Sequence, residues 1–63
     1  MNTSDQIATF TNAKFGIASI VTNTKKGYAV TFLDTDSETV IQTRFYPHDK
    51  QSLAIAYAKS LAI

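Results

Sequence analysis

The chain has no cysteine and no tryptophan, and only one proline, one histidine and two glycines among its 63 residues. The absence of cysteine excludes disulfides and thiolate metal sites, and a single histidine leaves no multi-histidine site. Two isolated glycines cannot form a glycine-rich phosphate loop. A domain of this size buries only about 60% of its unfolded surface, so its stability must come from an efficient core or from oligomerisation.

Charge is also scarce. Charged residues make up 17% of the chain, and the formal net charge is +1. Such a small net charge gives the whole chain no strong attraction to nucleic acid or to an anionic membrane. No apolar run approaches 18 residues, and the first residues lack the basic and apolar regions of a signal peptide. We therefore expect a cytoplasmic protein without a membrane partner, and nothing in the sequence indicates a cofactor.

The hydrophobic residues, 44% of the chain, fall into short alternating segments that are separated by polar turns. Alternation with a period of two predicts β-strands. The predicted strands are residues 15–22, 28–33 and 39–46, with residues 7–11 as an optional fourth strand at an edge. The predicted turns are residues 23–27 and 34–38, and residues 1–6 are expected to be frayed.

The second turn suggests a register for the last two strands. Opposing Phe32 with Ile41 leaves a four-residue loop and gathers the aromatic and branched side chains on one face. The register of the first hairpin is less defined, because Gly16 is a candidate β-bulge.

Pro47 ends the last strand because it cannot donate to a ladder, and Asp49 is the expected N-cap of a helix over residues 50–62. Ala54 and Ala58 would let this helix approach the sheet closely. The predicted fold is a single α+β domain over residues 1–63, with a three- or four-stranded antiparallel meander and one C-terminal helix packed on one sheet face. The predicted core is Phe15 or Ala18, Ile17 or Ile20, Tyr28, Val30, Phe32, Ile41, Phe45, Leu53, Tyr57 and Leu61.

Two patterns that resemble catalytic or metal sites fail on inspection. The acidic turn 34–38 begins like a calcium loop, but Thr39 and Phe45 stand where such a loop needs glycine and glutamate. His48 and Asp49 form a pair that could act as a general base, but no nucleophile has supporting spacing, and Ser52 lies in the first helical turn. The sequence therefore predicts neither a metal site nor an enzyme.

The two turns carry opposite charges, with Lys25 and Lys26 in the first and three acidic residues in the second. Consecutive turns of a meander lie at opposite ends of the sheet, so we expect one positive end and one negative end. This arrangement could steer a partner, or it could reflect only the solvation of turns.

Excess apolar surface is the most informative feature. If the predicted helix covers one sheet face, the other face is unusually apolar for a single-layer sheet. We predict that this second face binds a partner protein or a second copy of the chain. The predicted partner-binding residues are Thr31, Leu33, Val40, Gln42, Arg44 and Tyr46.

Residues 27–62 combine Gly27 to Phe32, the acidic turn, Thr43 to Phe45 and an alanine-rich helix with Lys59. This combination resembles the arm-type DNA-binding domain of phage integrases. It implies DNA contacts by basic residues on the open sheet face, and the candidate residues are Lys25, Lys26 and Arg44. Leu33 and Val40 depart from that pattern, which expects polar residues there.

The strand order, turn placement and size also resemble small phage-encoded inhibitors of the anti-CRISPR kind. That resemblance implies a module without a cofactor that occludes a host protein or complex, with arginine and tyrosine as anchors. The preferred hypothesis is this protein-binding module. The alternatives are a nucleic-acid-binding module of the integrase-arm type and a structural homodimer.

Overall fold

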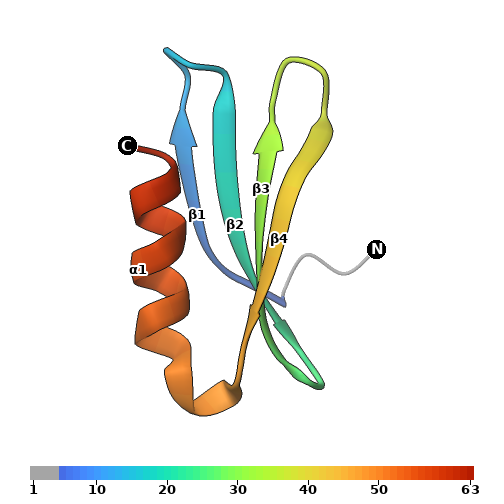
Figure 1. Cartoon of the computed structure of the whole chain (residues 1–63), viewed down its shortest axis with the longest axis vertical. Helices are drawn as coiled ribbons and strands as arrows, with labels where there is room; N and C mark the ends of the chain where they lie inside the picture. Colours follow the sequence, from blue (N-terminus) through green and yellow to red (C-terminus); the bar gives the residue numbers. More distant parts are fainter. Residues whose placement is uncertain (1–4) are drawn as a thin grey trace.

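The computed structural model describes residues 5–63 and shows a four-stranded antiparallel meander followed by one helix (Figure 1). The strand order is β1-β2-β3-β4, so β1 and β4 are the two sheet edges. The elements are β1 Gln6–Asn12, β2 Ile17–Thr24, β3 Gly27–Asp34, β4 Thr39–Tyr46, the 3-10 turn His48–Lys50 and α1 Gln51–Leu61. The predicted α+β class is confirmed, and the optional edge strand is present as β1. Of the segment expected to be frayed, residues 1–4 lie outside the described residues, and Gln6 belongs to β1.

Local hydrogen bonds explain the two turns that the sequence predicted. The Thr24 hydroxyl donates to the Gly27 carbonyl over 2.7 Å and accepts from the Lys26 amide, which closes the β2–β3 turn. In the β3–β4 turn the Asp34 carboxylate accepts from the backbone amides of Asp36 and Ser37. Short polar side chains that bond nearby backbone groups are what define such turns.

Gly16 lies in the β1–β2 turn and not in a strand bulge. Its φ of +66° is a conformation that suits glycine, and its carbonyl accepts a 2.8 Å hydrogen bond from the Thr35 amide. The β1–β2 turn is therefore tied to the β3–β4 turn. Phe15, predicted as a strand residue of the core, lies in this turn and is exposed.

The predicted register of the β3–β4 hairpin holds at the turn and fails beyond it. Leu33 pairs with Val40, as the four-residue loop requires, but Phe32 pairs with Gln42. A β-bulge inserts one extra residue, Ile41, into β4. A shift of one residue moves every following side chain to the other face of the sheet. Ile41 and Phe45, predicted as core residues, are consequently on the face away from the helix.

The helix begins later than predicted. Pro47 precedes a 3-10 turn that is closed by a 2.9 Å hydrogen bond from the Lys50 amide to the Pro47 carbonyl, and α1 starts at Gln51. Asp49 lies inside this turn and does not cap the helix, so the predicted N-cap is wrong. Proline favours this start because its ring fixes φ near the helical value. No helix within residues 5–63 is long and apolar enough to cross a membrane.

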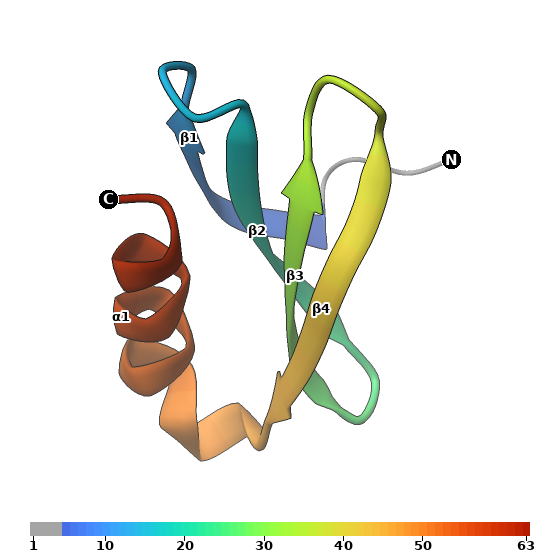
Figure 2. The same ribbon diagram turned by 45° about the horizontal axis from the view of Figure 1, so that its top comes forward.

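α1 lies along one face of the sheet (Figure 2), and a small core lies between the two. Its fully enclosed residues are Val21 and Val30 from the sheet and Ala54 and Ala58 from the helix. The predicted alanine contact is thus present. The partly buried residues that pack against this cluster are Ala8, Phe10, Tyr28, Tyr46, Ile55, Tyr57 and Leu61.

Leu53, which was predicted to face the sheet, is 53% exposed. The buried positions of the helix are Ala54, Ala58 and, just beyond its end, Ala62. The face that contacts the sheet is therefore rotated from the predicted one, and Leu53 lies at its margin. Within residues 5–63, more large apolar side chains are exposed than are fully buried.

Candidate interaction surface

The face of the sheet that α1 leaves uncovered carries a group of apolar side chains at the β4 edge. We call Thr31, Leu33, Val40, Ile41 and Phe45 the open-face patch. Pairing places Val40 opposite Leu33, and Thr43, between Ile41 and Phe45, opposite Thr31. Val40 is 57% exposed, Ile41 55% and Phe45 68%. Three large apolar side chains of one strand are therefore exposed to solvent.

The six predicted partner-binding residues do not share a face. Thr31, Leu33 and Val40 belong to the open-face patch, but Gln42, Arg44 and Tyr46 lie on the helix side of β4. The expectation of a single surface is wrong because the bulge at Ile41 reverses the alternation of the following residues. All six still lie on β4 or on β3 beside it.

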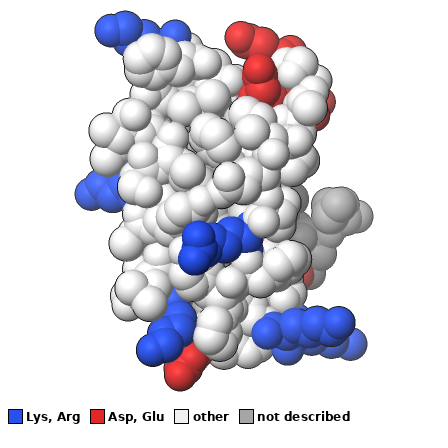
Figure 3. All heavy atoms as spheres, in the orientation of Figure 1, with Lys and Arg blue, Asp and Glu red and all other residues white. Residues whose placement is uncertain are grey.

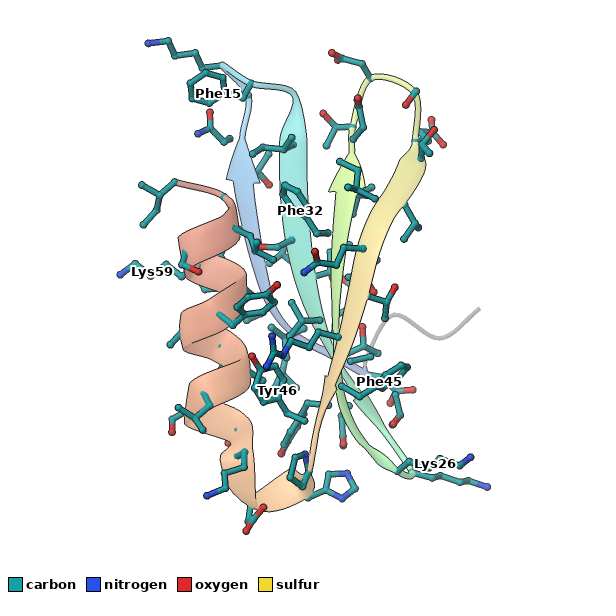
Figure 4. The ribbon with its side chains drawn as sticks, in the orientation of Figure 1. Phe15, Lys26, Phe32, Phe45, Tyr46 and Lys59 are labelled. Carbon is teal, nitrogen blue, oxygen red and sulfur yellow. The ribbon has the colours of Figure 1, made fainter. Side chains whose placement is uncertain are left out.

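On the helix side, an arginine–tyrosine cluster joins β4 and α1, and Figure 4 labels its member on β4, Tyr46. The Arg44 guanidinium carbon lies 5.4 Å from the ring centre of Tyr46 and 5.1 Å from that of Tyr57. The Gln42 side-chain amide donates to the Tyr57 hydroxyl. Cation–π contacts of this kind hold a long side chain in place. The fold thus holds the Arg44 side chain in position, although Arg44 is solvent-exposed like the rest of β4 up to Phe45.

The two ends of the sheet differ in charge (Figure 3). Asp36 and Glu38 lie in the β3–β4 turn, and Lys25 and Lys26 lie in the β2–β3 turn at the other end. Opposite placement of these turns is confirmed. The acidic end is not purely acidic, however, because Lys14 in the β1–β2 turn lies at that end too.

A shallow apolar concavity of about 440 Å³ lies at the end of β4 and is lined by Lys26, Phe45, Tyr46 and Pro47. It brings one of the two turn lysines next to the open-face patch. The concavity lies within the size range of small-ligand sites, but it has few polar groups to fix the orientation of a small molecule.

His48 has a structural partner set. Its Nε2 lies 3.1 Å from the Asn23 side-chain oxygen and 2.8 Å from the Thr24 carbonyl oxygen. Both partners are acceptors, so Nε2 carries the hydrogen and donates. The ring also contacts Tyr28 edge-on, with ring centres 5.3 Å apart. His48 thereby ties the 3-10 turn to the β2–β3 hairpin.

The candidate residues for nucleic-acid binding are not gathered into one site. Within residues 5–63 no group of three metal-ligating side chains comes together. Lys25 and Lys26 lie at the tip of a turn, whereas Arg44 lies on the helix side of β4 against two tyrosines.

Comparison with protein-family models, with curated proteins and with solved structures finds no match to this chain.

Sequence reasoning missed two members of the open-face patch, Ile41 and Phe45, because it assigned them to the core. It also missed a second role of Tyr57, which packs against the core cluster as predicted and in addition contacts Arg44 and Gln42 from the helix. The adjacent pair Val40 and Ile41 was the available signal, since two neighbouring apolar residues in a half-exposed strand break the alternation, as a bulge does.

Proposed function

We propose that this chain is a small non-enzymatic protein-binding module that occupies a surface of a larger protein or complex through its open-face patch. The observation that carries the proposal is the exposure of Val40, Ile41 and Phe45 together at one sheet edge. Contiguous apolar surface on a small domain is typical of an interaction site. Aromatic side chains such as Phe45 commonly anchor such interfaces.

The chemistry around the patch fits a protein surface better than a nucleic acid. The patch contains no charged side chain, and its one polar side-chain group is the Thr31 hydroxyl. Nucleic-acid affinity depends on several cations that contact phosphates together, and the lysines and Arg44 lie apart. Occlusion of a host protein or complex, the mode of the phage-encoded inhibitors that this sequence resembles, is the action we propose.

The proposal is tested by affinity capture from a lysate of the source cells, with and without nuclease, using matched substitutions. Phe45→Lys places a charge in the patch. Phe15→Lys makes the same change at a side chain of similar exposure, 65% against 68%, in the distant β1–β2 turn. We expect the wild-type protein and Phe15→Lys to capture the same protein after nuclease treatment, and Phe45→Lys to lose it.

Equal capture by Phe45→Lys and Phe15→Lys would show that the patch is not the interface. If nuclease removed everything bound by the wild-type protein, the protein-binding function would be wrong and the nucleic-acid alternative would replace it. Circular dichroism of both variants checks that the fold is intact.

A further inference from the structure

β4 is an exposed and weakly protected sheet edge. Within residues 5–63 it pairs with β3 alone, and every residue from Thr39 to Phe45 is exposed. Sheet edges are normally protected by charged side chains, proline, bulges or a covering segment. β4 holds one charged residue, Arg44, and no proline. Its bulge at Ile41 lies near one end, which leaves a regularly paired stretch from Gln42 to Tyr46.

We propose that β4 pairs antiparallel with β4 of a second copy, about a two-fold axis at Thr43, and so joins two sheets into one of eight strands. In this register Thr43 lies opposite its own equivalent, Ile41 lies opposite Phe45, and Gln42 lies opposite Arg44. Paired residues in an antiparallel ladder project to the same face. The two open-face patches therefore remain on one face, and both helices lie on the other.

The side chains are complementary in this register. Ile41 against Phe45 is a β-branched residue against an aromatic one, and threonine against threonine is also a favourable cross-strand pair. The Gln42 side-chain nitrogen already donates to Tyr57, so its oxygen is free to accept from Arg44 of the second copy. Each of the three kinds of pair is thus favourable.

The charges of the two ends favour the same arrangement. Antiparallel pairing brings the acidic β3–β4 turn of one copy to the far end of β4 in the other copy. Lys26 lies at that end, where it lines the concavity with Phe45, Tyr46 and Pro47. Glu38, directly before β4, therefore approaches the lysine end of the second copy. Opposite charges at both ends of the interface set its orientation.

The helix does not obstruct this pairing. α1 packs mainly on β2 and β3 and contacts β4 less, so the outer edge of β4 is clear of it (Figure 2). The inference does not require the proposed function, because it uses the backbone edge of β4 and leaves the patch side chains on an open face. If both hold, the second copy doubles the area of that face.

The first test is the solution mass as a function of concentration, measured by sedimentation equilibrium. We expect the wild-type protein to pass from 6.9 kDa towards twice that mass. Thr43→Lys places two lysines opposite each other at the two-fold axis and should raise the dimer dissociation constant about fivefold or more. Thr11→Lys is the matched control, because Thr11 is an exposed threonine on the other edge strand, β1.

The second test uses the absence of cysteine in the chain. Thr43→Cys introduces one thiol per copy at the axis, where directly opposed residues lie at a distance that a disulfide can span. Mild oxidation should convert Thr43→Cys to a covalent dimer much faster than Thr11→Cys.

Each outcome decides the inference. Loss of self-association in Thr43→Lys, with rapid cross-linking of Thr43→Cys, supports it. A dimer that tolerates Thr43→Lys uses another surface and overturns it. A protein that stays monomeric at millimolar concentration also overturns it. In that case, loss of the captured partner in Phe45→Lys would show that the proposed function stands without dimerisation.

Discussion

Replacing Ser19 with alanine should weaken the attachment of the helix to the sheet and lower the stability of the fold. Ser19 is fully buried, and its hydroxyl donates to the carbonyl of Ala58 across a sequence separation of 39 residues. The Ala62 amide, four residues beyond Ala58, donates instead to the Lys59 carbonyl. Carbonyls in the last turn of a helix need a partner outside the helix, and Ser19 supplies it.

The magnitude follows from what Ser19→Ala leaves behind. A buried carbonyl without a partner costs about 1–3 kcal/mol. A chain of 63 residues unfolds with an entropy of roughly 0.13 kcal/mol/K, from about 2.1 cal/mol/K per residue. The ratio predicts that the melting temperature falls by about 8–23 °C.

Thermal unfolding followed by far-UV circular dichroism measures this shift. Ser60→Ala is the control, because the Ser60 hydroxyl also donates to a helix carbonyl, that of Tyr57, but on the exposed side. An exposed change of this kind should move the stability by no more than about 0.5 kcal/mol, or about 4 °C. If Ser19→Ala shifts the melting temperature no further than Ser60→Ala does, the reasoning is refuted.

Three further predictions follow from backbone and packing geometry. Gly27→Ala should destabilise the fold by about 3 kcal/mol or more in urea unfolding, because Gly27 has φ +145° and a Cβ there would collide with the Tyr46 carbonyl; an unchanged midpoint would contradict this geometry. Glu38→Asn should stabilise by about 1 kcal/mol, since Glu38 holds a φ of 56° that asparagine tolerates better; calorimetry would show a raised melting temperature, and a lowered one would count against this explanation. Ala58→Leu should cost about 1–3 kcal/mol by overpacking against Val21 and Val30, so a variant that melts like the wild-type protein would mean that the helix can move away freely.

The strands and the helix could be predicted because their local signals agree with the fold. β4 was predicted with its observed bounds, Thr39–Tyr46, because the polar turn before it and Pro47 after it limit the strand on both sides. The strand 7–11 was left open, since five residues give little alternation to count. It pairs with β2 over 6–12.

The pairing beyond the bulge could not be predicted, because β4 has apolar residues in both phases of its alternation. Ile41 and Phe45 were placed on the helix face on the reasoning that aromatic and branched side chains gather in a core. The helix covers β4 poorly, however, so that face of the strand can carry Gln42 and Arg44 at little cost. The single extra residue then decides which residues reach each surface, and with them half of the candidate site.

The contact between Ser19 and Ala58 also bears on the order in which the molecule folds. Each strand pairs with its neighbour in the sequence, so the sheet assembles from local hairpins, which favours rapid folding. Docking of α1 brings together residues that are far apart in the sequence, such as Ser19 and Ala58. We therefore expect the helix to dock after the sheet has formed. A contact that forms after the rate-limiting step of folding affects the unfolding rate more than the folding rate. Loss of the Ser19 hydroxyl should therefore shorten the lifetime of the folded protein while its refolding rate stays nearly constant.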